Sequence, residues 1–272
     1  MKFSEEGDVR YLHFGTEWIQ GAMRIRKPDH IEFEYAQQMM AWLLFLETPE
    51  RIVQLGLGTA ALTKFCHRFL KRAKVEAVEL NPAVVIAARA MFDLPWDDAR
   101  LTVTEQGAWE FVNDRRNHGS IGALQIDIYH ATARGPVLDS VSFYRACRAC
   151  LTSQAGVVTV NLFGDHPSFV RNMRHLNEAF DRRVIALPEV HDGNRIVAGV
   201  RGSRARHSVR CAQRTHQVHR GRTRPARAQM GQGPSAKRGR AGHRRLHYLT
   251  STRTALSITK LFRIRRIVGE SP

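Results

Sequence analysis

Between residues 51 and 200, short apolar runs alternate with stretches of helical periodicity, in which apolar residues recur three and four positions apart. The runs that predict strands are 51–57, 75–80, 101–104, 123–129 and 156–163, and the helical stretches are 60–72, 82–91, 108–116, 139–151 and 167–180. Such alternation is typical of βαβ units, which build a parallel sheet with helices on both faces. The pattern therefore predicts an α/β domain.

The last two apolar runs of this region, 182–190 and 193–200, flank a turn at Asp192-Gly193-Asn194. Two strand-like runs around such a turn predict an antiparallel hairpin, which would close one edge of the sheet. A mostly parallel sheet that ends in a hairpin is the class I methyltransferase-like arrangement, a Rossmann-like fold. We therefore expect residues 49–200 to form a Rossmann-like, nucleoside-binding catalytic domain.

A smaller element precedes this domain. Residues 10–25 hold two short runs with partial alternation around a glycine, which predicts a small β-hairpin. Residues 29–46 follow Pro28 with helical spacing and predict one amphipathic helix, with Asp29 as its N-cap. Residues 1–48 are therefore expected to form an N-terminal β-hairpin plus helix.

The formal net charge of +17 arises from the C-terminal tail, residues 201–272. This segment contains a single acid, Glu270, many arginines and few large apolar residues, whereas residues 1–200 are nearly neutral. A segment that buries so little apolar surface is expected to be disordered. Two interpretations stay open: a nucleic-acid-binding arm, the one place where nucleic acid is expected, or a translated out-of-frame end.

Several classes of protein are disfavoured. No window approaches eighteen uninterrupted apolar residues and the N-terminus lacks the pattern of a secretory signal, so we expect a cytoplasmic protein without a membrane partner. Of the four cysteines, only Cys147 and Cys150 are close in sequence, within a predicted helix. A single C-x-x-C pair is weak evidence for a metal site, so we expect buried thiols and no metal.

The strongest local motif is a Gly-x-Gly turn, Gly56 and Gly58, between the first predicted strand and its helix. Glycines there let the backbone turn tightly and approach a ligand at the helix N-terminus. Glu79 ends the next apolar run, where an acid can bind the two hydroxyls of a ribose. Ala61 occupies the third glycine position of a dinucleotide motif, so an adenosyl sulfonium compound fits better than a dinucleotide.

Two further polar positions follow later strands. Gln106 and Gly107 come after the third run, where a polar side chain would meet an adenine amino group; an ordinary strand–helix turn is the alternative. Asp127 lies at the end of the fourth run, at the carboxyl edge where open α/β sheets bind ligands. We interpret Asp127 as an acid–base residue, with a structural ion pair to Arg134 as the alternative.

In order and rough spacing, these motifs resemble the spermidine synthase family of polyamine aminopropyltransferases over residues 10–200. The segments that carry the resemblance are Glu32-Phe33-Glu34-Tyr35, Gly56-Leu57-Gly58, Val78-Glu79-Leu80-Asn81, Gln106-Gly107-Ala108, Asp127-Ile128-Tyr129-His130, Gly135-Pro136 and Phe143-Tyr144. The tail lies outside the resemblance.

The resemblance implies aminopropyl transfer from decarboxylated S-adenosylmethionine to a polyamine acceptor, with release of 5′-methylthioadenosine. The donor would be held by Gly56, Gly58, Glu79, Gln106 and Gly107, and Asp127 would take the proton of the attacking amine. The acceptor would be faced by Tyr35, Gln20, Tyr129 and His130. The resemblance also implies a homodimer.

The chain departs from the family pattern in four places. His130 replaces a second acid, Ala60-Ala61 replace a Gly-Gly pair, Gln106 replaces an Asp, and the loop 187–193 lacks the tyrosine of the family. Fewer acids then line the expected amine site, so the identity of the acceptor stays open.

Glu189 and Asp192 are candidates to compensate for the missing acid. Two alternatives to aminopropyl transfer also stay open. One is methyl transfer from intact S-adenosylmethionine to a small molecule, and the other is a degenerate, non-catalytic relative.

Overall fold

The computed structural model describes residues 1–15, 19–129, 138–164, 166–190 and 193–203. The chain divides into two units, residues 1–213 and 214–272. The expectations about the tail beyond residue 203 and about Cys211 lie outside the described residues.

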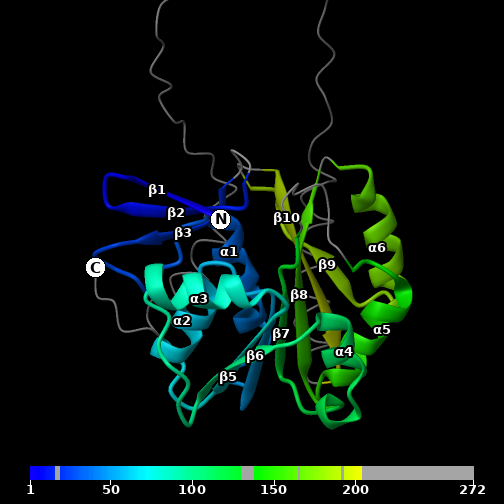
Figure 1. The fold of residues 1–272 in the computed structure, drawn as a ribbon. Coiled ribbons are helices and arrows are strands. Elements are labelled where there is room, and N and C mark those ends of the chain that lie inside the picture. Colours follow the sequence, from blue (N-terminus) through cyan, green and yellow to red (C-terminus); the bar gives the residue numbers. More distant parts are fainter. Residues whose placement is uncertain (16–18, 130–137, 165, 191–192, 204–272) are drawn as a thin grey trace, which may run out of the picture. The chain divides into compact units, whose positions relative to one another are not determined.

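A seven-stranded sheet forms the centre of the first unit, with the order β6-β5-β4-β7-β8-β10-β9 (Figure 1). The strands are β4 (Arg51–Leu55), β5 (Lys74–Glu79), β6 (Leu101–Glu105), β7 (Ala123–Ile126), β8 (Gly156–Phe163), β9 (Val184–Ala186) and β10 (Asn194–Arg201). Strands β4 to β8 are parallel, and β10 pairs antiparallel with both β8 and β9. The class I methyltransferase-like prediction is confirmed, including the closing hairpin.

Helices cover both faces of this sheet (Figure 1). One face packs against α1 (Glu34–Met39), the 3₁₀ helix η1 (Met40–Leu44), α2 (Ala61–Phe69) and α3 (Pro82–Met91). The other face packs against α4 (Ala108–Asn113), α5 (Val141–Cys150) and α6 (Ser168–Ala179), and a 3₁₀ turn, η2 (Arg115–Asn117), follows α4. Because central strands such as β8 are buried on both sides, their sequences read as continuous apolar runs.

The N-terminal element is a three-stranded antiparallel sheet of β1 (Lys2–Glu6), β2 (Val9–His13) and β3 (Ile19–Arg24). The hairpin expected over residues 10–25 corresponds to β2 and β3. Strand β1 was not expected, because all five of its side chains are exposed and give no alternating hydrophobic pattern.

The single helix expected over residues 29–46, with Asp29 as its cap, is wrong. The chain forms two short elements instead, α1 and η1, and the N-cap of α1 is Phe33. Glu32 is held by two hydrogen bonds from Arg24 of β3, of 3.0 and 2.6 Å, which tie the preceding segment to the N-terminal sheet. Gln37 Nε2 also donates to the carbonyl of Ile31 at 2.8 Å, so the backbone before residue 34 is bonded outside a helix.

A buried polar layer fixes the C-terminal end of α1 on the sheet. Gln54, Gln125 and Thr159 lie side by side on β4, β7 and β8. Gln54 Nε2 donates to Gln125 Oε1 at 3.0 Å, and both Gln125 Nε2 and Thr159 Oγ1 donate to the carbonyl of Met39, at 3.1 and 3.0 Å. Because buried amides need partners, this layer fixes the position of α1 relative to the strands.

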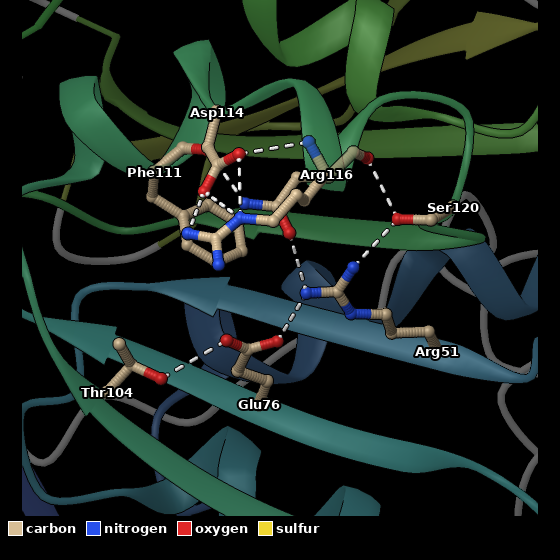
Figure 2. Close-up of polar contacts among 8 residues, drawn as sticks. Arg51, Glu76, Thr104, Phe111, Asp114, Arg116 and Ser120 are labelled. Carbon is tan, nitrogen blue, oxygen red and sulfur yellow. Dashed lines mark hydrogen bonds and ion pairs between the residues drawn. The ribbon is translucent and has the colours of Figure 1, made fainter.

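A second network lies at the start of β4, near η2 (Figure 2). Arg51 donates to Glu76 of β5 at 2.6 Å, to Asn117 Oδ1 at 2.9 Å and to Ser120 Oγ at 2.7 Å. Glu76 also accepts a hydrogen bond from Thr104 of β6 at 3.2 Å. Each half-buried charge is therefore paired, and the network links three strands to the loop after α4.

The three described cysteines, Cys66, Cys147 and Cys150, are free and buried, as expected for structural thiols. Within the described ranges, no three His, Cys, Asp or Glu side chains form a group that could hold a metal ion. The same ranges contain no helix long and apolar enough to span a membrane.

Lys64 of α2 is almost completely buried, and its Nζ donates to the carbonyl of Phe92 at 2.6 Å. Burial lowers the pKa of Lys64 from 10.5 to about 8, although the charges of Asp93 and Asp29 oppose this. Replacing the buried ammonium in Lys64→Met should raise the free energy of unfolding at pH 7 by about 1–3 kcal/mol. Urea denaturation would measure this, with the exposed Lys71→Met as control.

The sign of the pH dependence follows from proton binding. Between pH 8 and 10.5 the unfolded chain keeps the Lys64 proton that the folded chain has lost, so this residue makes the wild type more stable as pH rises. The advantage of Lys64→Met should therefore shrink between pH 8 and pH 10. An advantage that is equal at both pH values would contradict this account.

Candidate active site

A cavity of about 1110 Å³ opens at the carboxyl ends of the parallel strands. The loops after β4, β5, β6 and β7 line it, together with the end of β8, and β3 and α1 of the N-terminal part contribute to its wall. This is the edge at which open α/β sheets bind their ligands. The structure therefore brings the N-terminal element and the sheet together around one site.

The Gly-x-Gly turn after β4 lies against the loop after β7. Gly56 has φ +93°, and a Cβ at this position would lie 2.2 Å from the backbone oxygen of Asp127. Gly58 has φ +53° and open space around it. Ala60, the N-cap of α2, has φ +57°, a left-handed conformation that costs a residue with a side chain about 1 kcal/mol. Only glycine permits the close approach at residue 56.

Two backbone N–H groups orient the carboxylate of Glu79 at the end of β5. Leu57 N donates to Oε2 at 3.0 Å and Asn81 N donates to Oε1 at 2.9 Å. A carboxylate offers about four lone pairs. Each Glu79 oxygen therefore keeps acceptor capacity for the hydroxyl groups of a ligand at the cavity wall.

Gln106 and Gly107 follow β6 and also line the cavity. The backbone N–H of Gln106 donates to the carbonyl of Glu79 at 3.0 Å, so the loops after β5 and β6 are joined. Trp109 lines the cavity beyond them and stacks on Phe143 at 6.4 Å between ring centroids. An aromatic surface and an amide side chain therefore lie on the same wall as Glu79.

Asp127 follows β7 directly and also lines the cavity. Its Oδ1 accepts a hydrogen bond from Asn161 Nδ2 at 2.9 Å, and its side chain is also hydrogen-bonded to Tyr35 of α1. Burial raises the pKa of Asp127 above its ordinary value, while these two hydrogen bonds act in the opposite direction. A carboxylate with a raised pKa at a cavity wall is suited to accept a proton. Arg134, its alternative ion-pair partner, lies outside the described residues.

Two other predicted acceptor residues, Tyr129 and Gln20, line the same cavity. The Tyr129 hydroxyl donates to the carbonyl of Asn161 at 2.6 Å, and burial raises the pKa of Tyr129, so the hydroxyl stays protonated. Gln20 of β3 lines the cavity from the N-terminal sheet. His130 lies outside the described residues.

Of the two residues proposed to compensate for the missing acid, the structure describes only Glu189. Glu189 is exposed, does not belong to the described residues that line the cavity, and lies beside Gly164. Asp192 lies outside the described residues.

Two residues of the site were missed by the sequence analysis, Asn161 of β8 and Asn194 of β10. Both are buried, both line the cavity, and Asn194 Nδ2 donates to Asn161 Oδ1 at 2.9 Å. A polar residue near the carboxyl end of an otherwise apolar run was the available signal for Asn161. Asn194 belongs to a predicted turn, and its position there gave no such signal.

Two known relatives of the chain are polyamine aminopropyltransferases. No family model matches the chain. A polyamine aminopropyltransferase of Chromobacterium violaceum is 32% identical over 203 residues, which are 75% of this chain and 77% of the relative. One from Neisseria meningitidis serogroup B is 29% identical over 201 residues, 74% of this chain and 75% of the relative.

Solved structures show the same fold. The crystal structure of a probable spermidine synthase from Corynebacterium glutamicum has a TM-score of 0.61 at 17% identity, covering 73% of this chain and 75% of that one. Human methyltransferase-like protein 13 in complex with SAH has a TM-score of 0.54 at 18% identity, covering 72% of this chain and 96% of that one.

Proposed function

Because this chain belongs to the polyamine aminopropyltransferase family, we propose that it transfers the aminopropyl group of decarboxylated S-adenosylmethionine to an amine of the polyamine class. The other product is then 5′-methylthioadenosine. S-adenosylmethionine itself would suit the same fold, so the choice between the two donors depends on the cavity wall.

The charge of the cavity wall is the observation that carries the proposal. The described residues that line the cavity include four acids, Glu32, Glu79, Glu110 and Asp127, and no Lys, Arg or His. Glu32 is paired with Arg24, which leaves three carboxylates without a described ion-pair partner. An anionic wall attracts a sulfonium and an ammonium and repels the carboxylate of intact S-adenosylmethionine. This favours the decarboxylated donor and a cationic acceptor.

The donor is assigned to the part of the cavity between the loops after β4, β5 and β6. The oriented Glu79 carboxylate suits the two ribose hydroxyls, and the turn at Gly56 and Gly58 lets the backbone approach the ligand. Gln106 and Gly107 suit the adenine edge. These assignments rest on the placement of the residues and on the family.

Glu79→Gln tests the donor site. A glutamine amide cannot accept hydrogen bonds from both Leu57 N and Asn81 N, so one of them loses its partner. We expect KM for the donor to rise by about 10–100-fold, with a smaller change in kcat. Steady-state kinetics would measure this.

Glu76→Gln is the matched control for Glu79→Gln. It removes a carboxylate from the same strand, within the Arg51 network (Figure 2). It should lower stability and leave the donor KM unchanged. An equal KM in Glu79→Gln and the wild type would remove Glu79 from the donor site.

The chemistry is assigned to Asp127. An aliphatic amine with a pKa of about 10 is protonated at neutral pH, so it must lose a proton before it can attack. Asp127 takes this proton, the amine nitrogen forms a bond to the carbon beside the sulfonium, and the C–S bond breaks to give a neutral thioether. Tyr35, Tyr129 and Gln20 would position the amine, together with His130 of the undescribed segment. The pocket thus supplies orientation and charge.

The experiment is mass spectrometry of the nucleoside released by the purified full-length chain. One reaction contains decarboxylated S-adenosylmethionine and putrescine, and the other contains S-adenosylmethionine and putrescine. Methylthioadenosine in the first reaction alone supports the proposal. S-adenosylhomocysteine in the second would point to methyl transfer, and no nucleoside product in either would favour a non-catalytic relative.

The homodimer and the cytoplasmic location expected from the sequence stay predictions. Sedimentation equilibrium would test the first, and fractionation of the source cells the second.

A further inference from the structure

We propose that Asn161 is the positioning residue of the active site: its side-chain amide, oriented by Asn194, holds the Asp127 carboxylate in place to receive the proton of the acceptor. This inference deepens the proposed function and rests on it for the role of Asp127. It assigns a part in the reaction to two buried residues that the sequence analysis did not single out.

Asn161 holds two side chains of the cavity wall at once. Its Nδ2 donates to Asp127 Oδ1 at 2.9 Å, and its backbone carbonyl accepts the hydroxyl of Tyr129 at 2.6 Å. The side chain is only 3% exposed and comes from the central strand β8, so it has little freedom to move. A rigid strand therefore sets the position of both Asp127 and Tyr129.

Asn194 supports the orientation in which the NH₂ group of Asn161 faces Asp127. Its Nδ2 donates to Asn161 Oδ1 at 2.9 Å from β10, the antiparallel neighbour of β8. If the amide were turned over, its oxygen would face the Asp127 carboxylate and its NH₂ group would face that of Asn194. Both contacts are unfavourable, so the pair of asparagines keeps an N–H donor directed at Asp127.

This donor acts on the chemistry in two ways. It takes one of the about four lone-pair sites of the carboxylate, which also accepts the bond from Tyr35, so the carboxylate keeps capacity for the proton. It also stabilises the charged form of Asp127 against the cost of burial. Among the described residues, the titratable groups that face Asp127 are Tyr35 of α1 and Tyr129 of the following loop. Both carry hydroxyl groups. Among the described residues, no cation therefore helps Asn161 to stabilise the charge of Asp127.

The test compares Asn161→Leu with Asn172→Leu. Asn172 of α6 is also a buried asparagine, but it bonds to Tyr144 and Ser168 and does not line the cavity among the described residues. The first readout is a ¹³C NMR titration of labelled aspartate carboxyls, with the Asp127 signal identified by its absence in Asp127→Asn. The second is the pH dependence of kcat/KM.

In Asn161→Leu we expect the pKa of Asp127 to rise by about one unit, because one hydrogen bond to the charged form is lost. The acid limb of kcat/KM should move by the same amount, and kcat at pH 7 should fall by about ten-fold. Asn172→Leu should lose stability and leave both readouts unchanged.

Asn194→Ala provides a second variant should Asn161→Leu fail to fold. It keeps the Asn161 donor but removes its orientation, so a smaller shift in the same direction is expected. An Asp127 titration that is identical in Asn161→Leu or Asn194→Ala and in Asn172→Leu would overturn the proposal. Because the NMR titration needs no turnover, an inactive wild type would refute the proposed function without deciding the role of Asn161.

Discussion

Asp127→Asn should reduce turnover at pH 7 by about 10²–10⁴-fold, the range typical of removing a general base. An amide in place of the carboxylate keeps the shape of the side chain but cannot take the proton of the amine. The hydrogen bond from Asn161 and the contact with Tyr35 identify this carboxylate as the one held in place at the cavity wall. The measurement is kcat and KM for both substrates.

The same variant should be at least as stable as the wild type. Burial raises the pKa of Asp127 in the folded chain, so the folded state binds more protons than the unfolded state as pH rises above about 4. This difference lowers the stability of the wild type as pH rises, and asparagine, which does not titrate, removes it. A lower melting temperature together with lost activity would point to misfolding instead.

Asp114→Asn is the control for Asp127→Asn. Asp114, the N-cap of η2, pairs with Arg116 (Figure 2) and does not belong to the described residues that line the cavity. Its replacement should leave kcat within a factor of about two, since exposed ion pairs contribute little. Turnover that survives Asp127→Asn to within a factor of about ten would show that another group takes the proton.

Gly56→Ala should lower the free energy of unfolding of the domain and abolish activity. The added Cβ would lie 2.2 Å from the backbone oxygen of Asp127, and φ of +93° is unfavourable for alanine. We expect a loss of about 2–4 kcal/mol in the free energy of unfolding. Because the atom that must move belongs to Asp127 itself, kcat should fall by about 100-fold or more. Urea denaturation and steady-state kinetics measure the two effects.

Gly119→Ala separates backbone strain from the steric contact. Gly119 has φ +68°, and a Cβ there would meet nothing within 4 Å. Its replacement should cost about 1 kcal/mol and leave kcat unchanged. Equal destabilisation by the two glycine substitutions would mean that the backbone of Asp127 moves away from the added Cβ at no cost in free energy.

The structure brings together the predicted site residues whose placement depended on topology. Gly56, Gln106 and Asp127 each follow a parallel strand, Glu79 ends one, and the carboxyl ends of parallel strands meet at one edge. Their common cavity therefore follows from strand order alone. The errors lie in the N-terminal part, where β1 shows no hydrophobic pattern and Arg24 keeps the segment around Glu32 out of the helix.

The sequence by itself determined the α/β class, the closing hairpin and the edge at which the site lies, because these depend on local periodicity and on chain order. The tertiary structure alone decided which side chains meet at that edge. Tyr35 reaches Asp127 because a buried layer that includes Gln125 and Thr159 fixes α1, and Asn161 meets Asn194 through the register of β8 with β10. Such contacts join residues far apart in the chain, and local sequence patterns do not encode register between distant strands.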